Sequence, residues 1–202
     1  LAEADPRLKI LNKPCIDTLW LNPLSFPENP YHNLVKHYQD GRLDGGHLSD
    51  PELDSRLVLS VLEAQFSALS KLHRGTPETV CVFHWLTTQG FQAEGFDTLF
   101  AKVRGCQKPK ADEAQAALQK VLRGKACTHQ VENAVAWARS SGWSLAYAIS
   151  WINVAGGDSV MPPWVRHQFP EAAQFVRRLR DTPCSSTSCS WCRSENDLHG
   201  LL

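Results

Sequence analysis

Three cysteines near the end of the chain have the spacing of metal ligands. Cys184, Cys189 and Cys192 form a Cys-x4-Cys-x2-Cys pattern. Thiolates at these spacings can converge on one ion, because a tight Cys-x2-Cys turn directs two sulfurs to the same side. The pattern therefore predicts a metal-binding knuckle, in which Trp191 is expected to pack on the helical body.

The spacing leaves the fourth ligand open. A closed structural zinc site needs four ligands, and His199 is the nearest candidate after Cys192. Cys127 or His129 are alternatives that would fold over from the preceding region. Cys-x4-Cys-x2-Cys with a distant fourth cysteine is also an iron–sulfur spacing, and the candidates for that cysteine are Cys127, Cys106, Cys81 and Cys15. Structural Zn²⁺ ranks first, three free thiols second and an iron–sulfur cluster third.

A second stretch could do chemistry of another kind. From His47 to Asp54 the chain carries one histidine and three acids, and a long apolar-periodic segment follows. Carboxylate oxygens are the ligands that hard cations such as Mg²⁺ or Mn²⁺ prefer. The stretch also fits an ordinary helix start, with Asp50 as N-cap and Pro51 at the first helical position. Both interpretations stay open.

The composition narrows the class of protein. The chain has 202 residues, of which 43% are hydrophobic, and its 21 basic and 21 acidic residues give a net charge of zero. This excludes a wholly basic nucleic-acid coat protein but permits a local basic surface. There is no apolar run long enough to span a membrane, so no membrane partner is expected. Seven cysteines, an odd number, favour a reducing compartment and a cytoplasmic protein over a disulfide framework. The first residue is leucine, which suggests a segment of a longer chain.

The hydrophobic pattern predicts a mainly α protein with a short α/β part at the N-terminus. The β-branched and aromatic content of Cys15–Leu21 predicts a buried strand or strand end. From Pro51 onward apolar residues recur at helical spacing. Capping, proline and glycine signals divide that region into helices starting at Pro51, Thr76, Phe96, Ala111, Thr128, Trp143 and Pro170. His84 is expected to be a buried, hydrogen-bonded histidine within one of these helices.

The N-terminal residues resemble part of a known family. Three segments look like motifs of DEDD-type 3′–5′ exonucleases, namely Cys15-Ile16-Asp17-Thr18-Leu19, Tyr31-His32-Asn33-Leu34 and Asp54-Ser55-Arg56-Leu57. Residues 1–72 therefore resemble the C-terminal half of such a domain, which implies an RNase H-like fold. The whole chain is similar to the segment between exonuclease and helicase motor in large bacterial RecQ-like helicase proteins. The resemblance implies a partial nuclease at residues 1–72 and a helical connector at 73–181, and the cysteine pattern adds a metal-binding knuckle at 182–202.

The resemblance also implies roles for two residues. Asp54 would be a metal-binding acid and His47 the general base of a two-metal nuclease using Mg²⁺ or Mn²⁺. His47 lies two residues out of the family's register, and the motifs that supply the other three acids are absent. The isolated segment is therefore expected not to cleave nucleic acid.

A basic cluster indicates a nucleic-acid contact. Trp164 lies near a set of basic residues, and a tryptophan beside arginines can stack bases. The set expected to bind nucleic acid is Trp164, Arg166, Arg177, Arg178 and Arg180. The leading hypothesis is a metal-stapled connector that positions nucleic acid, DNA in preference to RNA, beside a nuclease and a helicase motor of its own longer chain. Alternatives are a non-enzymatic helical adaptor for a protein partner, or a degenerate nuclease domain that binds single strands without cutting.

Overall fold

The computed structural model describes residues 13–28, 51–90, 93–154 and 161–192. In these ranges every regular element is a helix, which confirms the mainly α prediction. The elements are α1 (Thr18–Ser25), α2 (Pro51–Gly75), α3 (Pro77–Thr87), α4 (Ala93–Arg104), α5 (Ala111–Leu122), α6 (Thr128–Asn153), α7 (Pro163–Gln168), α8 (Glu171–Val176) and the π-helical turn η3 (Arg177–Asp181). None of the described helices has both the length and the apolar character that crossing a lipid bilayer requires.

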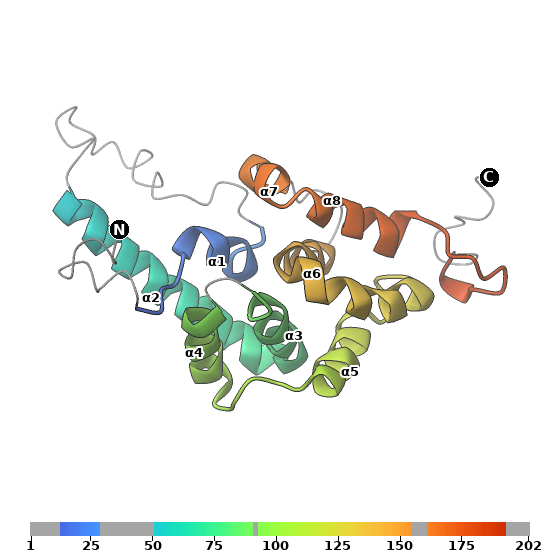
Figure 1. Cartoon of the computed structure of the whole chain (residues 1–202), viewed down its shortest axis with the longest axis horizontal. Coiled ribbons are helices and arrows are strands. Elements are labelled where there is room, and N and C mark those ends of the chain that lie inside the picture. Colours follow the sequence, from blue (N-terminus) through green and yellow to red (C-terminus); the bar gives the residue numbers. More distant parts are fainter. Residues whose placement is uncertain (1–12, 29–50, 91–92, 155–160, 193–202) are drawn as a thin grey trace.

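Helix α6 lies in the middle of the molecule. It packs on α3 and α5 on one side and on α8 on the other, while α1 joins it to α2 (Figure 1). The fully buried side chains, among them Phe83, Phe96, Leu118 and Ile149, form one continuous cluster through these helices. That cluster also contains Leu69 of α2, so the described core crosses the expected boundary at residue 72.

The predicted strand at Cys15–Leu21 is wrong. Asp17 instead caps α1, because its Oδ1 accepts hydrogen bonds from the backbone N–H groups of Leu19 at 2.8 Å and Trp20 at 3.3 Å. Leu21 and Leu24 are then buried one turn apart on the same helix face. The described part of residues 1–72 is helical, and an α/β half is not observed in it.

The two helices predicted around Thr128 and Trp143 are joined in α6. Non-helical backbone at Ser141, with φ −139° and ψ 43°, kinks the helix where the sequence signals a break. Gly142 follows the kink and lies against α3 so closely that a Cβ would be 2.2 Å from the carbonyl oxygen of Leu86. At the other end of α6 the N-cap residue is Cys127, one residue before Thr128, which was the expected N-cap.

One C-terminal helix, α7, is not among the predicted helices, and the helix predicted to start at Pro170 is divided. Pro163 is the first residue of α7, where its missing N–H leaves no intrahelical bond unmade. The single helix expected over 170–181 is instead α8 followed directly by η3, whose hydrogen bonds span one residue more per turn. This wider turn leads the chain to the cysteines.

Candidate metal centre

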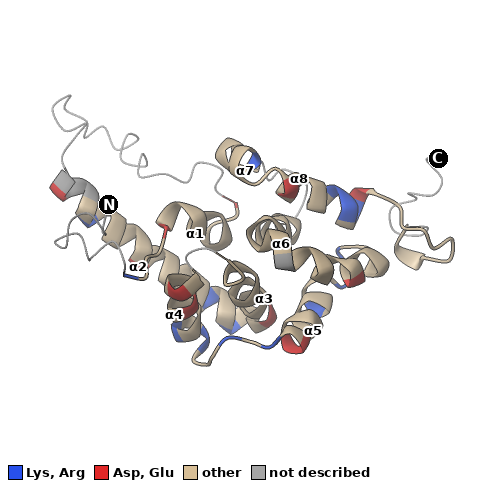
Figure 2. Ribbon diagram, viewed as in Figure 1, with Lys and Arg blue, Asp and Glu red and all other residues tan. Residues whose placement is uncertain are grey.

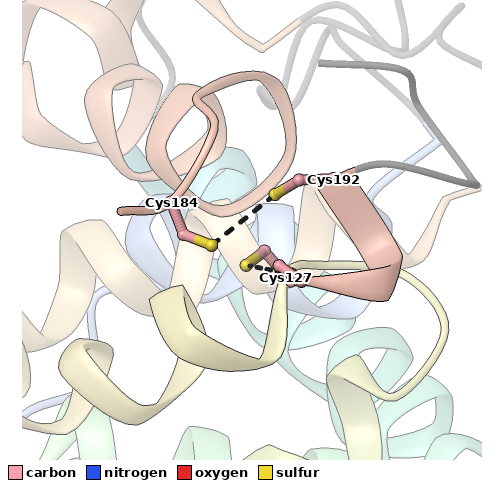
Figure 3. Close-up of side chains that lie close together, drawn as sticks. Cys127, Cys184 and Cys192 are labelled. Carbon is pink, nitrogen blue, oxygen red and sulfur yellow. Dashed lines mark hydrogen bonds between the residues drawn. The ribbon is translucent and has the colours of Figure 1, made fainter. Parts of the chain in front are cut away.

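Four buried cysteines converge at the C-terminal end of the described chain. The sulfurs of Cys127, Cys184, Cys189 and Cys192 all lie within 4.8 Å of one another. The Sγ atoms of Cys127 and Cys189 are 3.6 Å apart, and those of Cys184 and Cys192 are 3.9 Å apart. In Figure 3 the labelled sulfurs of Cys127, Cys184 and Cys192 point toward one common space, the first from the start of α6 and the others from the C-terminal segment. We call these four residues the cysteine centre.

Local backbone structure positions each thiol. Cys127 sits at the N-cap of α6, and its N–H donates to the carbonyl oxygen of Leu179 at 3.0 Å, which ties the start of α6 to η3. The N–H of Cys189 donates to the carbonyl oxygen of Ser186 at 3.2 Å, so the chain turns back toward Cys184. The half-buried ring of Trp191 packs against the cysteine centre, whereas the expected contact was with the helical body.

Burial is the largest influence on the acidity of three of these thiols. Burial raises the pKa of Cys127 to about 12 and also raises the pKa of Cys192. Burial acts in the same direction on Cys189, but the N–H of Cys192 and the neighbouring thiols bring the pKa of Cys189 below its ordinary value. Four thiolates crowded together would repel one another, and a bound cation is the simplest group that removes this repulsion.

The spacing of the sulfurs fits a single ion. Tetrahedral Zn²⁺ with bonds of about 2.3 Å places its sulfurs about 3.8 Å apart, close to the observed 3.6 and 3.9 Å. In a four-iron cluster each thiolate binds a different iron at a separate corner, so the sulfurs are spread more widely. The chemistry of four cysteine ligands without an open position is that of a closed structural site.

The predicted ligands are only partly those of the centre. Cys184, Cys189 and Cys192 are brought together as expected, and the described residue that completes the set is Cys127, one of the open alternatives. His199, the nearest candidate in sequence, lies outside the described residues. The His129 side chain is half exposed, and its Nδ1 lies 3.9 Å from a carboxylate oxygen of Glu132. The helices α6, α7 and α8 separate Cys127 from the knuckle in the sequence, so only the fold distinguishes it from the other candidate ligands.

The residues assigned to nuclease chemistry are not tested by the described structure. His47 lies outside the described residues, and Asp54 lies in α2 with its side chain outside them. The described neighbour Glu52 pairs with Arg56 at 2.6 Å on the exposed surface of the same helix. Asp17, from the motif-like N-terminal segment, serves as a helix cap.

The residues expected to bind nucleic acid are of two kinds, one tryptophan that packs against the core and four arginines. Trp164 is half-buried and packs at the edges of Tyr147 and Phe169, with ring centroids 6.0 and 6.5 Å away. Arg166 in α7 is exposed, and Arg177, Arg178 and Arg180 in η3 are exposed or half-buried. Figure 2 marks basic residues in blue on α7 and directly after α8. Much of Trp164 is therefore occupied by core contacts, whereas the guanidinium groups are exposed or half-buried.

A second group of ionisable side chains joins α3, α4 and α5. His84, whose side chain is 0% exposed, lies 2.6 Å from Asp97 through Nε2 and 3.1 Å from Arg104 through Nδ1. Arg104 also donates to Glu113 at 2.9 Å. An arginine can only donate, so His84 accepts at Nδ1 and donates from Nε2. This His84 network (His84, Asp97, Arg104 and Glu113) confirms the expectation of a buried, hydrogen-bonded histidine.

Comparisons with protein families, with curated proteins and with solved structures found no match for this chain.

Proposed function

We propose that this chain is a non-catalytic helical module in which one structural Zn²⁺ ion staples the C-terminal knuckle to the start of α6, within a larger protein that processes nucleic acid. The observation that carries the proposal is the convergence of four buried sulfurs within 4.8 Å of one another. Two of the elements that supply them, the start of α6 and the segment after η3, are far apart in sequence. A bound ion would therefore close a large loop and hold α7, α8 and η3 on the helical body.

Metal analysis of two matched variants tests the staple. Purified chain, with zinc supplied and thiols reduced, is expected to hold about one zinc ion. Cys127→Ser removes one sulfur of the centre and should reduce the zinc content and affinity strongly. Cys106→Ser is the control, because this cysteine is exposed and outside the centre. Zinc content well below one per chain, or equal zinc affinity in both variants, would contradict the proposal.

Cobalt substitution checks the geometry. Co²⁺ bound by four thiolates in a tetrahedral site gives intense visible and near-ultraviolet absorption. We expect that spectrum from the full chain and a weakened, shifted spectrum from Cys127→Ser. The iron–sulfur alternative is tested by reconstituting the chain with iron and sulfide. A stable cluster that excludes Zn²⁺ would identify iron as the bound metal.

One observation favours the adaptor hypothesis as a second candidate. Near the start of α2, Leu59 is 62% exposed and Val58 is 37% exposed, and they are the exposed large hydrophobic residues of the described chain. A helix that presents apolar side chains on several faces usually packs against something. Leu59→Lys should weaken association with a protein partner and leave zinc binding unchanged, which separates this candidate from the staple.

The exonuclease resemblance stays a prediction. On that resemblance Asp54 and His47 would act with Mg²⁺ or Mn²⁺ only beside the further acids of the family's other motifs. The test is the sequence preceding Leu1 in the full gene. A strand with an Asp-x-Glu pattern there would support the nuclease, and its absence would leave the staple and the adaptor.

A further inference from the structure

The π-helical turn η3 concentrates positive charge beside the cysteine centre. Its five residues, Arg177 to Asp181, include three arginines and one acid. Arg177 and Arg178 are exposed, Arg180 is half-buried, and Leu179 between them is fully buried. We call this element the arginine turn. A π-helical turn is rare and less well packed than an α-helical one, and such turns recur at functional sites.

The ion pairs formed by the described residues do not include the arginines of this turn. Among the described residues no acid lies within ion-pair distance of Arg177, Arg178 or Arg180. Two arginines of other helices do have a carboxylate partner: Arg56 pairs with Glu52 at the surface, and the largely buried Arg104 pairs with Glu113, whose side chain is 54% exposed. Unpaired guanidinium groups present forked donors that match the oxygens of a phosphate.

Arg178 is held by a contact to Trp137 of α6, and that contact covers the tryptophan ring. The guanidinium carbon of Arg178 lies 5.2 Å from the ring centroid of Trp137. The Trp137 ring also stacks on Phe175, with an interplanar angle of 8° and centroids 5.2 Å apart. Cation–π contact restricts Arg178 without neutralising it. Since arginine and phenylalanine both occupy Trp137, this ring is not available to stack a nucleic-acid base.

The turn is attached to the metal centre on both sides. The carbonyl oxygen of Leu179 accepts from the N–H of Cys127 at 3.0 Å, and Cys184 follows the turn after a short extended link. A metal ion bound by Cys127 and Cys184 would therefore fix the positions of both attachment points. The same ion with four thiolates carries a net negative charge, which the neighbouring arginines would offset in part.

We propose that the arginine turn binds the phosphodiester backbone of nucleic acid without reading its bases, and that the metal centre holds the turn in its binding conformation. The coupling to metal rests on the proposed staple, whereas the phosphate contact does not. Because no base-stacking ring is offered by Trp137, single-stranded and double-stranded DNA should bind through the same phosphate contacts. Binding should weaken steeply with added salt.

Fluorescence anisotropy with a labelled single-stranded DNA and its duplex tests the contact on the full zinc-loaded chain. Arg177→Gln/Arg178→Gln should lower the affinity about tenfold and reduce the slope of log K against log salt by about 2. The control is Arg56→Gln/Arg74→Gln, which removes the same charge from exposed positions on α2 and should leave the affinity and the slope unchanged. Equal effects of the two double variants would overturn the proposal, as would binding to anionic lipid vesicles with no binding to DNA.

Removing the metal separates this inference from the staple. Chelation under reducing conditions should lower the DNA affinity of the parent chain to nearly that of Arg177→Gln/Arg178→Gln and have little effect on that variant. If zinc binds and DNA affinity is the same with and without it, the coupling is wrong and the staple stands. If the double variant loses zinc while the zinc-loaded parent does not bind DNA, the arginines serve only to neutralise the centre, and the inference is overturned.

Discussion

The cysteine centre and the His84 network both contain buried ionisable side chains, four thiols in the first and His84 with Arg104 in the second, but their interactions are completed differently. In the network each group meets a complementary one, since Asp97 accepts from His84, His84 accepts from Arg104, and Arg104 donates to Glu113. In the centre the thiols meet mainly one another. Buried polar groups normally have protein partners. A buried set of thiols that meet mainly one another could therefore hold a metal ion, whereas a complete set indicates a structural connection between helices.

The largest expected effect comes from removing the metal, which should destabilise the C-terminal region and leave the His84 network intact. At free zinc a thousandfold above Kd, zinc binding should raise the free energy of unfolding of the C-terminal region by about 4 kcal/mol. The metal-stripped chain should keep the helical circular dichroism of α2 to α6, because their core does not include the centre. Hydrogen exchange should show protection lost over 177–192 and retained in α3. Equal loss in both regions would mean that the two are not independent.

Breaking the network should have a smaller but global effect. Arg104→Met keeps much of the side-chain volume and leaves His84 Nδ1 without its donor. Only 6% of the Arg104 side chain is exposed, so we expect a cost of about 2–3 kcal/mol in urea unfolding. Arg56→Met, which breaks an exposed pair, should cost less than about 0.5 kcal/mol. Zinc content should be the same in both variants, in contrast to Cys127→Ser.

Acidification should weaken both regions by different routes. Burial holds the pKa of His84 below its ordinary value of 6.5, despite the opposing effect of Asp97. The unfolded chain then takes up a proton more readily than the folded chain. This contribution to stability is complete above that ordinary pKa and is lost as the pH falls below it toward the folded value.

A pH series on the metal-stripped chain measures the contribution of the His84 network alone. The free energy of unfolding should fall on acidification in the parent and less in His84→Gln. With zinc present an additional loss should follow from protonation of the thiolates, and more zinc should offset it. A zinc-independent pH profile would show that the centre does not contribute.

The smallest expected effect concerns the identity of the fourth ligand. His129→Ala should leave zinc affinity unchanged, because His129 is half exposed and is not part of the centre. His199→Ala should also leave it unchanged if Cys127 completes the set. Competition with a colorimetric zinc chelator measures both. A large loss in either variant would replace Cys127 as the fourth ligand.

Sequence reasoning found the parts of the molecule that depend on local spacing. The knuckle cysteines, the helix starts at prolines and the buried His84 all follow from residues close together in the chain. The strand predicted at Cys15–Leu21 was wrong because β-branched and aromatic content outweighed the capping signal of Asp17. Strand propensity depends strongly on the neighbours that a segment acquires.

The remaining features depend on contacts that spacing cannot encode. Cys127 was one of several candidates, and it was singled out only when α6 and η3 came together through the hydrogen bond to Leu179. The partners of His84 lie on two other helices. Likewise, the enclosure of Trp137 between Phe175 and Arg178 is a consequence of how α8 packs on α6.

The position of Cys127 at the start of α6 has a mechanical consequence. With zinc bound, tension applied to the chain beyond Cys192 would pass through metal–sulfur bonds directly to the start of α6. The helices α7 and α8 would lie inside a closed loop and would be shielded from that load. The C-terminal segment would then be anchored at the junction of α5 and α6, and the short turn between Leu122 and Cys127 would bear the first strain.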